Sequence, residues 1–204
     1  MSNRREFLQM SLVASALPAI AADGRENAAP YPDNAAGRAR KVDVIVETMS
    51  PMALAFGDEA ARLGLEPHGI KDDITDLWCH TLDLQWKRGP ATLAGITLST
   101  SLFCLETLAR DYGMRVWFRA IHNCLPGREL EHFLAGPESL VRQAAAFGGQ
   151  WSAGFAGMAA RLPPLDSSKW LKKNLESAAR TREPGPMVSW IIAPRRTIQS
   201  HLIS

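Results

Sequence analysis

Short apolar runs alternate with helical stretches along the first two thirds of the chain. Four runs, at 42–48, 65–70, 91–96 and 114–121, are rich in Val, Ile and Leu and bounded by Gly, Pro or polar residues, which is typical of strands. Between them, apolar residues recur every three to four positions at about 51–63, 74–87 and 98–109, as on one face of a helix. The pattern therefore predicts a regular alternation of strand and helix.

This alternation, with connections of a few residues, predicts an α/β fold. We expect an open, mostly parallel sheet with helices on both faces, a Rossmann-like or doubly wound arrangement. Gly64 and Gly113 are expected to end the first and third helices.

The last third of the chain follows a different pattern. From Leu140 to Leu162 apolar residues recur at helical spacing, interrupted at Gly148 and Gly149. Ser168 is expected to cap a basic helix, and residues 187–193 to form a last strand. We therefore predict a helical C-terminal addition from about residue 137, within a single domain spanning 41–204.

Composition limits the classes of protein to consider. The chain has 204 residues, 46% of them apolar and 22% charged, as in an ordinary folded domain. Lys and Arg number 23 against 21 Asp and Glu, so the net charge of +2 gives no indication of a nucleic-acid partner. Beyond the N-terminus no stretch is long and apolar enough to predict a transmembrane span.

The N-terminus carries the most specific motif. Arg4 and Arg5 are followed by Phe7 and Leu8, then by an uncharged apolar stretch that ends in Ala19-Ile20-Ala21. This segment resembles a twin-arginine export signal, although Asn3 stands where Ser or Thr is usual and Gln9 where Lys is usual. Small residues at 19 and 21 suit cleavage after residue 21.

The resemblance implies a location and a state of folding. Residues 1–21 are expected to be a signal peptide, residues 22–40 a flexible linker, and the mature protein to reach the periplasm. The twin-arginine pathway carries proteins that have already folded. Its cargo often holds a cofactor, or travels bound to a partner that does.

Polar residues follow each of the four predicted strands, where ligands bind in open parallel sheets. Hydroxyl groups near helix N-termini suit a small polar or anionic ligand, and a histidine, a carboxylate and a thiol could transfer protons or attack a substrate. Capping of the helices is the alternative role for most of these residues. The expected ligand-binding residues are Thr48, Ser50, Thr97, Thr100 and Ser101, and the candidate catalytic residues are His122, Asp73 and Cys124.

The usual motifs of several enzyme classes are absent from the sequence. There is no phosphate-binding loop, no Gly-x-Gly-x-x-Gly after the first strand, and no Gly-x-Ser-x-Gly. No Cys-x-x-Cys or His-x-x-x-His spacing indicates a metal site, so none is predicted, and the sequence names no cofactor.

Two functions remain open. The first is an exported protein that binds a small polar or anionic molecule at the strand ends; whether it also transforms that molecule stays open. The second is a non-catalytic accessory subunit of a larger exported oxidoreductase, for which we expect an exposed apolar patch along residues 147–158.

Overall fold

A computed structural model describes residues 42–123, 130–165, 169–177 and 186–195. The predicted signal peptide and linker lie outside the described residues, and so does Cys124. Within the described ranges, no helix combines the length and the apolar character needed to cross a membrane.

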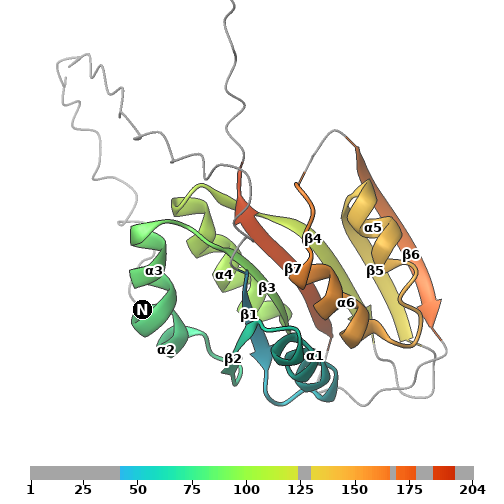
Figure 1. The fold of residues 1–204 in the computed structure, drawn as a ribbon, viewed down its shortest axis with the longest axis horizontal. Helices are drawn as coiled ribbons and strands as arrows, with labels where there is room; N and C mark the ends of the chain where they lie inside the picture. The colour runs from blue at the N-terminus through green and yellow to red at the C-terminus, as the bar shows by residue number, and fades with distance from the viewer. Residues whose placement is uncertain (1–41, 124–129, 166–168, 178–185, 196–204) are drawn as a thin grey trace, which may run out of the picture. The chain divides into compact units, whose positions relative to one another are not determined.

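Seven strands form one sheet in the order β2-β1-β3-β7-β4-β5-β6 (Figure 1). The strands are β1 (Val42–Glu47), β2 (Glu66–Ile70), β3 (Thr92–Leu98), β4 (Met114–Asn123), β5 (Leu130–Pro137), β6 (Trp170–Ser177) and β7 (Met187–Pro194). The helices are α1 (Pro51–Arg62), α2 (Thr75–Leu77), η2 (Trp78–Leu82), α3 (Asp83–Arg88), α4 (Ser99–Asp111), α5 (Glu138–Ala144) and α6 (Trp151–Ala160).

The fold is α/β, as expected. Its sheet is not mostly parallel, so the expectation of a mostly parallel sheet is wrong. Among the described strands, only β1 with β2 and β1 with β3 pair in parallel, whereas the pairs β3–β7, β7–β4, β4–β5 and β5–β6 are antiparallel. The physical reason is that β7 inserts between β3 and β4, where a doubly wound sheet would pair those two strands directly. The described strands therefore do not support a Rossmann-like arrangement.

The helices cover the two faces of the sheet with separate apolar cores. On one face α1, α5 and α6 pack over a core that includes Phe56, Phe118 and Phe155. On the other face α3 and α4 pack over a core that includes Trp86 and Trp190. Figure 1 shows α1 and α6 side by side in front of the sheet, the arrangement on which the candidate site depends.

The prediction of a helical C-terminal addition is partly wrong. The stripe from residue 140 does form helices α5 and α6, but the expected basic helix from Ser168 is strand β6 at the sheet edge. Leu171 and Leu175 are both partly buried, and a spacing of four suits one face of a strand as well as one face of a helix. Pairing with β5, a strand that the sequence did not predict, selects the strand.

The packing of the Trp190 indole against β3 requires a glycine at position 95. Gly95 lies opposite Trp190 in the register, and a Cβ at Gly95 would stand 2.5 Å from Cζ2 of that indole and 2.8 Å from the carbonyl oxygen of Ile45. The absence of a side chain lets the indole Nε1 donate to Thr97 Oγ1 at 3.0 Å.

We expect Gly95→Ala to lower the free energy of unfolding by about 1–3 kcal/mol, because neither the indole nor the backbone oxygen can move away freely. Gly149→Ala is the matched control, since a Cβ there meets nothing within 4 Å. Urea unfolding of both variants measures the difference. Equal stabilities would contradict the packing described here.

Candidate functional site

The predicted ligand-binding residues after β1 are engaged in local structure. Ser50 caps α1, because its Oγ accepts the amide N–H of Ala53 at 3.0 Å. The exposed Thr48 donates its hydroxyl to the carbonyl oxygen of Ile70 at 2.9 Å, which ties β1 to β2. Both side chains therefore have structural roles at this edge of the sheet.

The predicted residues around α4 are divided between interior and surface. Thr97 is buried, accepts from Trp190 and donates to the carbonyl oxygen of Leu98 at 3.0 Å. Thr100 is exposed, while Ser101 is buried and its Oγ has no hydrogen-bond partner among the described residues.

Asp73, a candidate catalytic residue, stabilises a turn before α2. Its Oδ1 accepts from the amide and the hydroxyl of Thr75, at 2.8 and 2.7 Å. These hydrogen bonds lower the pKa of the exposed Asp73 carboxyl, so it is a weak proton acceptor at neutral pH. No hydrogen bond joins Asp73 to His122 in the described part of the chain.

His122 is the candidate catalytic residue that lies in a connected polar cluster. It is fully buried with His132 of β5 and Ser189 of β7, and Trp151 of α6 covers them. We call these four residues the histidine cluster. His132, Ser189 and Trp151 were not among the residues predicted from the sequence.

Sheet register and one β-bulge bring the cluster together. His122 pairs with His132 across β4 and β5, and Ser189 pairs with Ala120 one step along the same face. The bulge between Val116 and Phe118 changes which alternate residues of β4 face α6. Without it, His122 would point to the opposite face, because a shift of one residue reverses every side chain.

A chain of short hydrogen bonds runs through the cluster. Trp151 Nε1 donates to Ser189 Oγ at 2.9 Å, and this oxygen lies 2.7 Å from His122 Nε2. His122 Nδ1 in turn lies 2.6 Å from His132 Nδ1. The Trp151 ring stacks on the His132 ring with centroids 4.5 Å apart and planes 12° apart.

The number of donors and acceptors in this series of hydrogen bonds determines which nitrogen of each histidine carries the proton. The Trp151 indole can only donate, so the Ser189 hydroxyl is free to donate onward to His122 Nε2. A neutral His122 then carries its proton on Nδ1 and donates it to His132 Nδ1. His132 consequently holds its own proton on Nε2. The reverse order would leave the buried Ser189 hydroxyl without a hydrogen-bond acceptor among the described residues.

Burial keeps both imidazoles neutral at physiological pH. It lowers the pKa of His122 well below the usual 6.5, and the neighbouring His132 lowers it further. Burial also lowers the pKa of His132 to about 4. A charged ring in either position would have to lose its hydration without a counter-charge.

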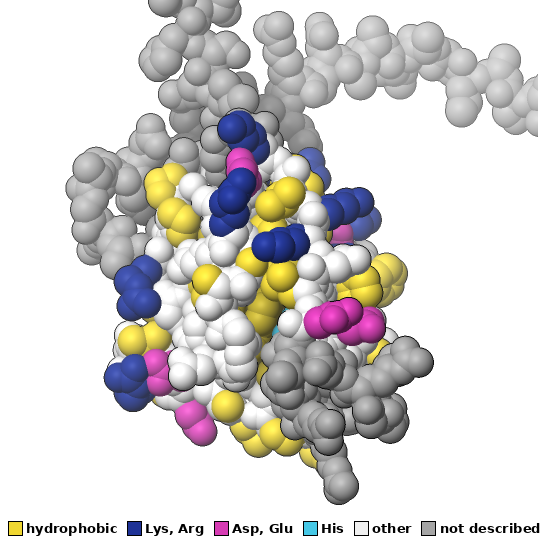
Figure 2. All heavy atoms as spheres, turned by 90° about the vertical axis from the view of Figure 1, so that its right-hand side faces the viewer, with side chains coloured by type: hydrophobic (Ala, Val, Ile, Leu, Met, Phe, Trp, Pro, Cys, Tyr) yellow, Lys and Arg dark blue, Asp and Glu magenta, His cyan; other side chains and the backbone are white. Residues whose placement is uncertain are grey.

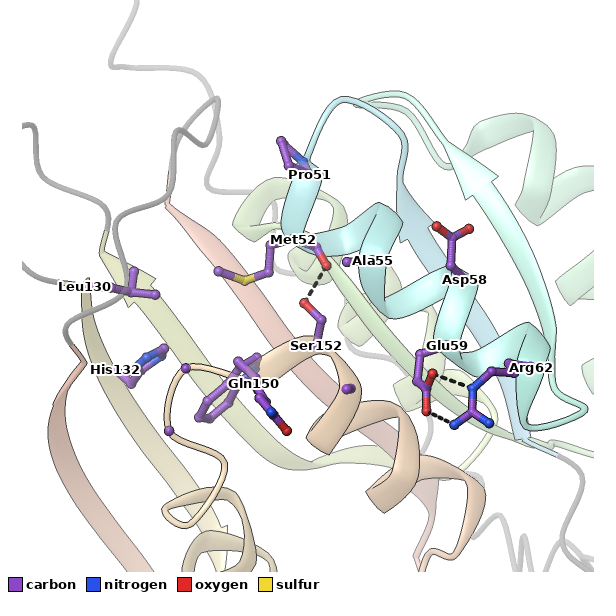
Figure 3. A pocket seen from close by; sticks show the side chains of 14 residues that line it. Pro51, Met52, Ala55, Asp58, Glu59, Arg62, Leu130, His132, Gln150 and Ser152 are labelled. Atoms are coloured by element: carbon purple, nitrogen blue, oxygen red, sulfur yellow. Dashed lines mark hydrogen bonds and ion pairs between the residues drawn. The ribbon is translucent and has the colours of Figure 1, made fainter.

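His132 joins the cluster to a cavity of about 620 Å³ between α1, the start of α6 and the start of β5. Figure 3 shows the His132 ring directed from β5 toward the loop that precedes α6. Its Nε2 is buried and has no hydrogen-bond partner in the described part of the chain. The remaining lining residues are Pro51, Met52, Ala55, Asp58, Glu59, Arg62, Leu130, Gly148, Gly149, Gln150, Trp151, Ser152 and Ala153.

The geometry defines what the site can do. Ser189 is fully buried and does not line the cavity, so its hydroxyl acts as an internal link and not as a nucleophile. His132 lines the cavity, and its Nε2 lies buried in a nearly water-free environment. No group of three or more His, Cys, Asp or Glu suited to a metal ion occurs in the described ranges.

The neutral histidines make stability depend on pH. Between about pH 6.5 and 4 the unfolded chain binds protons that the folded His122 and His132 refuse, so stability falls as the pH falls through this window. Each histidine contributes a slope of up to about 1.4 kcal/mol per pH unit. Urea unfolding at several pH values measures this slope.

His132→Gln removes one titrating ring. It should therefore reduce the slope of stability against pH by up to the contribution of one proton, about 1.4 kcal/mol per pH unit. A wild-type slope equal to that of His132→Gln would contradict this expectation, because His132 would then take up its proton over the same pH range in the folded and the unfolded chain.

Comparison with known proteins finds no relative of this chain: no family model, no curated protein and no solved structure matches it. The function must therefore be inferred from the histidine cluster and the cavity beside it.

Proposed function

We propose that this chain is an exported protein that binds a small polar or anionic molecule in the cavity between α1, α6 and β5. The observation that carries the proposal is His132 Nε2, a buried polar atom that has no partner among the described residues and belongs to a residue lining this cavity. An unpaired buried donor costs about 1–3 kcal/mol, and a ligand that accepts its hydrogen bond removes that cost.

The position of the cavity supports the same function. α1 starts directly after β1, and β5 starts at the edge where β4 ends, so the cavity opens where the carboxyl ends of β1 and β4 lie. This is the edge at which sequence reasoning places the ligand, although the residues that line the cavity differ from those predicted. Its volume is within the range of small-molecule sites.

Export is supported by the resemblance of residues 4–8 to a twin-arginine signal. A protein that folds before it crosses the membrane can close its apolar cores in the cytoplasm. Because the resemblance implies export to the periplasm, we propose that the mature protein binds its ligand there.

The second candidate, an accessory subunit of an exported oxidoreductase, is favoured by one observation. Trp170 on the edge strand β6 is 47% exposed and stands beside the exposed Lys172 and Lys173. Figure 2 shows this side of the molecule, where several Lys and Arg side chains surround apolar ones. The apolar patch expected along residues 147–158 is absent, because Phe155 to Met158 are buried.

Filling the cavity should abolish ligand binding. Ala55 is exposed and lines the cavity from α1, so Ala55→Phe occupies the space that the ligand needs. Ala61→Phe is the matched control, because Ala61 is exposed on the same helix and is not part of the lining. Native mass spectrometry of the protein taken from its own host measures the bound mass.

We expect a single chain with a small added mass in the wild type and in Ala61→Phe, and a bare chain in Ala55→Phe. Retention of the mass in Ala55→Phe would place the ligand elsewhere. A complex with a larger protein, and no small ligand, would favour the accessory subunit instead.

A further inference from the structure

The first turn of α6 borders the cavity without a side-chain cap. The residue before the helix, Gln150, makes no capping hydrogen bond, in contrast to Ser50 before α1. The amides of Trp151, Ser152 and Ala153 have no carbonyl partner within the helix, because the first amides of any helix lack one. All three residues line the cavity, so this helix of 10 residues directs the positive end of its dipole toward it.

His132 supplies an independent donor at the same place. The side chain is 2% exposed, and its Nε2 has no protein partner in the described ranges. The proton order set by Ser189 and His122 makes this atom an N–H donor. Gly148 and Gly149, which carry no side chains, line the same cavity.

Beyond these donors, the cavity has an apolar wall and one end that carries charge. Pro51, Met52 and Leu130 provide apolar contacts. Glu59 forms an ion pair with Arg62, while Asp58 leaves a net negative charge in the lining. Asp58 lies six residues beyond Met52, about 9 Å along α1. A dianion would be repelled by this carboxylate more strongly than a monoanion.

We infer that the molecule bound in this cavity is a small organic carboxylate, whose oxygens accept from His132 Nε2–H and from the first amides of α6. This inference rests on the proposed function. The carboxylate end faces the helix N-terminus, and the organic part contacts the apolar wall. A neutral donor and a helix dipole suit a monoanion, because they provide hydrogen bonds without a full positive charge.

The test uses the full mature chain and named probes. Butyrate, its neutral analogue butyramide, and inorganic phosphate are titrated at pH 7 and constant ionic strength, and backbone amide shifts are followed by NMR. We expect butyrate to shift the amide signals of residues 151–153 and to bind at least about tenfold more tightly than butyramide or phosphate.

Substitutions at position 132 test the donor itself. His132→Phe keeps a ring on Trp151 but removes the donor, and should weaken butyrate binding about tenfold. His132→Gln restores an N–H at similar reach and should recover most of the affinity. His80→Gln, at an exposed residue outside the cavity, should bind butyrate as the wild type does.

Several results would overturn the inference. Butyramide that binds as tightly as butyrate, and is blocked by Ala55→Phe, would leave cavity binding intact but exclude a carboxylate. Preferential binding of phosphate would do the same in favour of an inorganic oxyanion. Absence of amide shifts with butyrate would reject the carboxylate class, whichever molecule the protein carries from its host.

Discussion

The hydrogen-bond chain from Trp151 through Ser189 and His122 to His132 is the constraint on which the site depends. Three polar side chains of the sheet and the indole of Trp151 from α6 lie in an otherwise apolar core, where each unpaired group would cost stability. Each link satisfies a donor or an acceptor of the next. The chain of hydrogen bonds is complete at Trp151, whereas His132 Nε2 has no partner among the described residues and belongs to a residue that lines the cavity.

The arrangement of helices around this chain explains the position of the cavity. Ser152 Oγ donates to the carbonyl oxygen of Met52 at 2.8 Å, which fixes the start of α6 against the start of α1. Trp151, the first residue of α6, is thereby held over His132. The same contact leaves the N-terminus of α6 facing the cavity, so the packing that buries the histidines also brings a second set of donors to the site.

The sequence predicts the parallel βαβ half of the fold well, because hydrophobic period and local caps determine it; Gly64 and Gly113, for example, adopt the expected positive φ. The sequence-based prediction fails where pairing between strands that are distant in the sequence determines the structure. The insertion of β7 between β3 and β4 has no local signal, and neither does the bulge that turns His122 toward α6. His122 was recognised as a polar residue at a strand end, but its partners His132 and Ser189 come from two strands whose register only the folded sheet reveals.

The proton order in the histidine cluster is the central claim, since it makes His132 a donor toward the cavity. Long-range ¹H–¹⁵N NMR of the imidazole nitrogens at pH 7 identifies the tautomer of each ring directly. The account predicts two neutral rings, with His122 protonated on Nδ1 and His132 on Nε2. A proton on His132 Nδ1, or a doubly protonated ring in either residue, would contradict it.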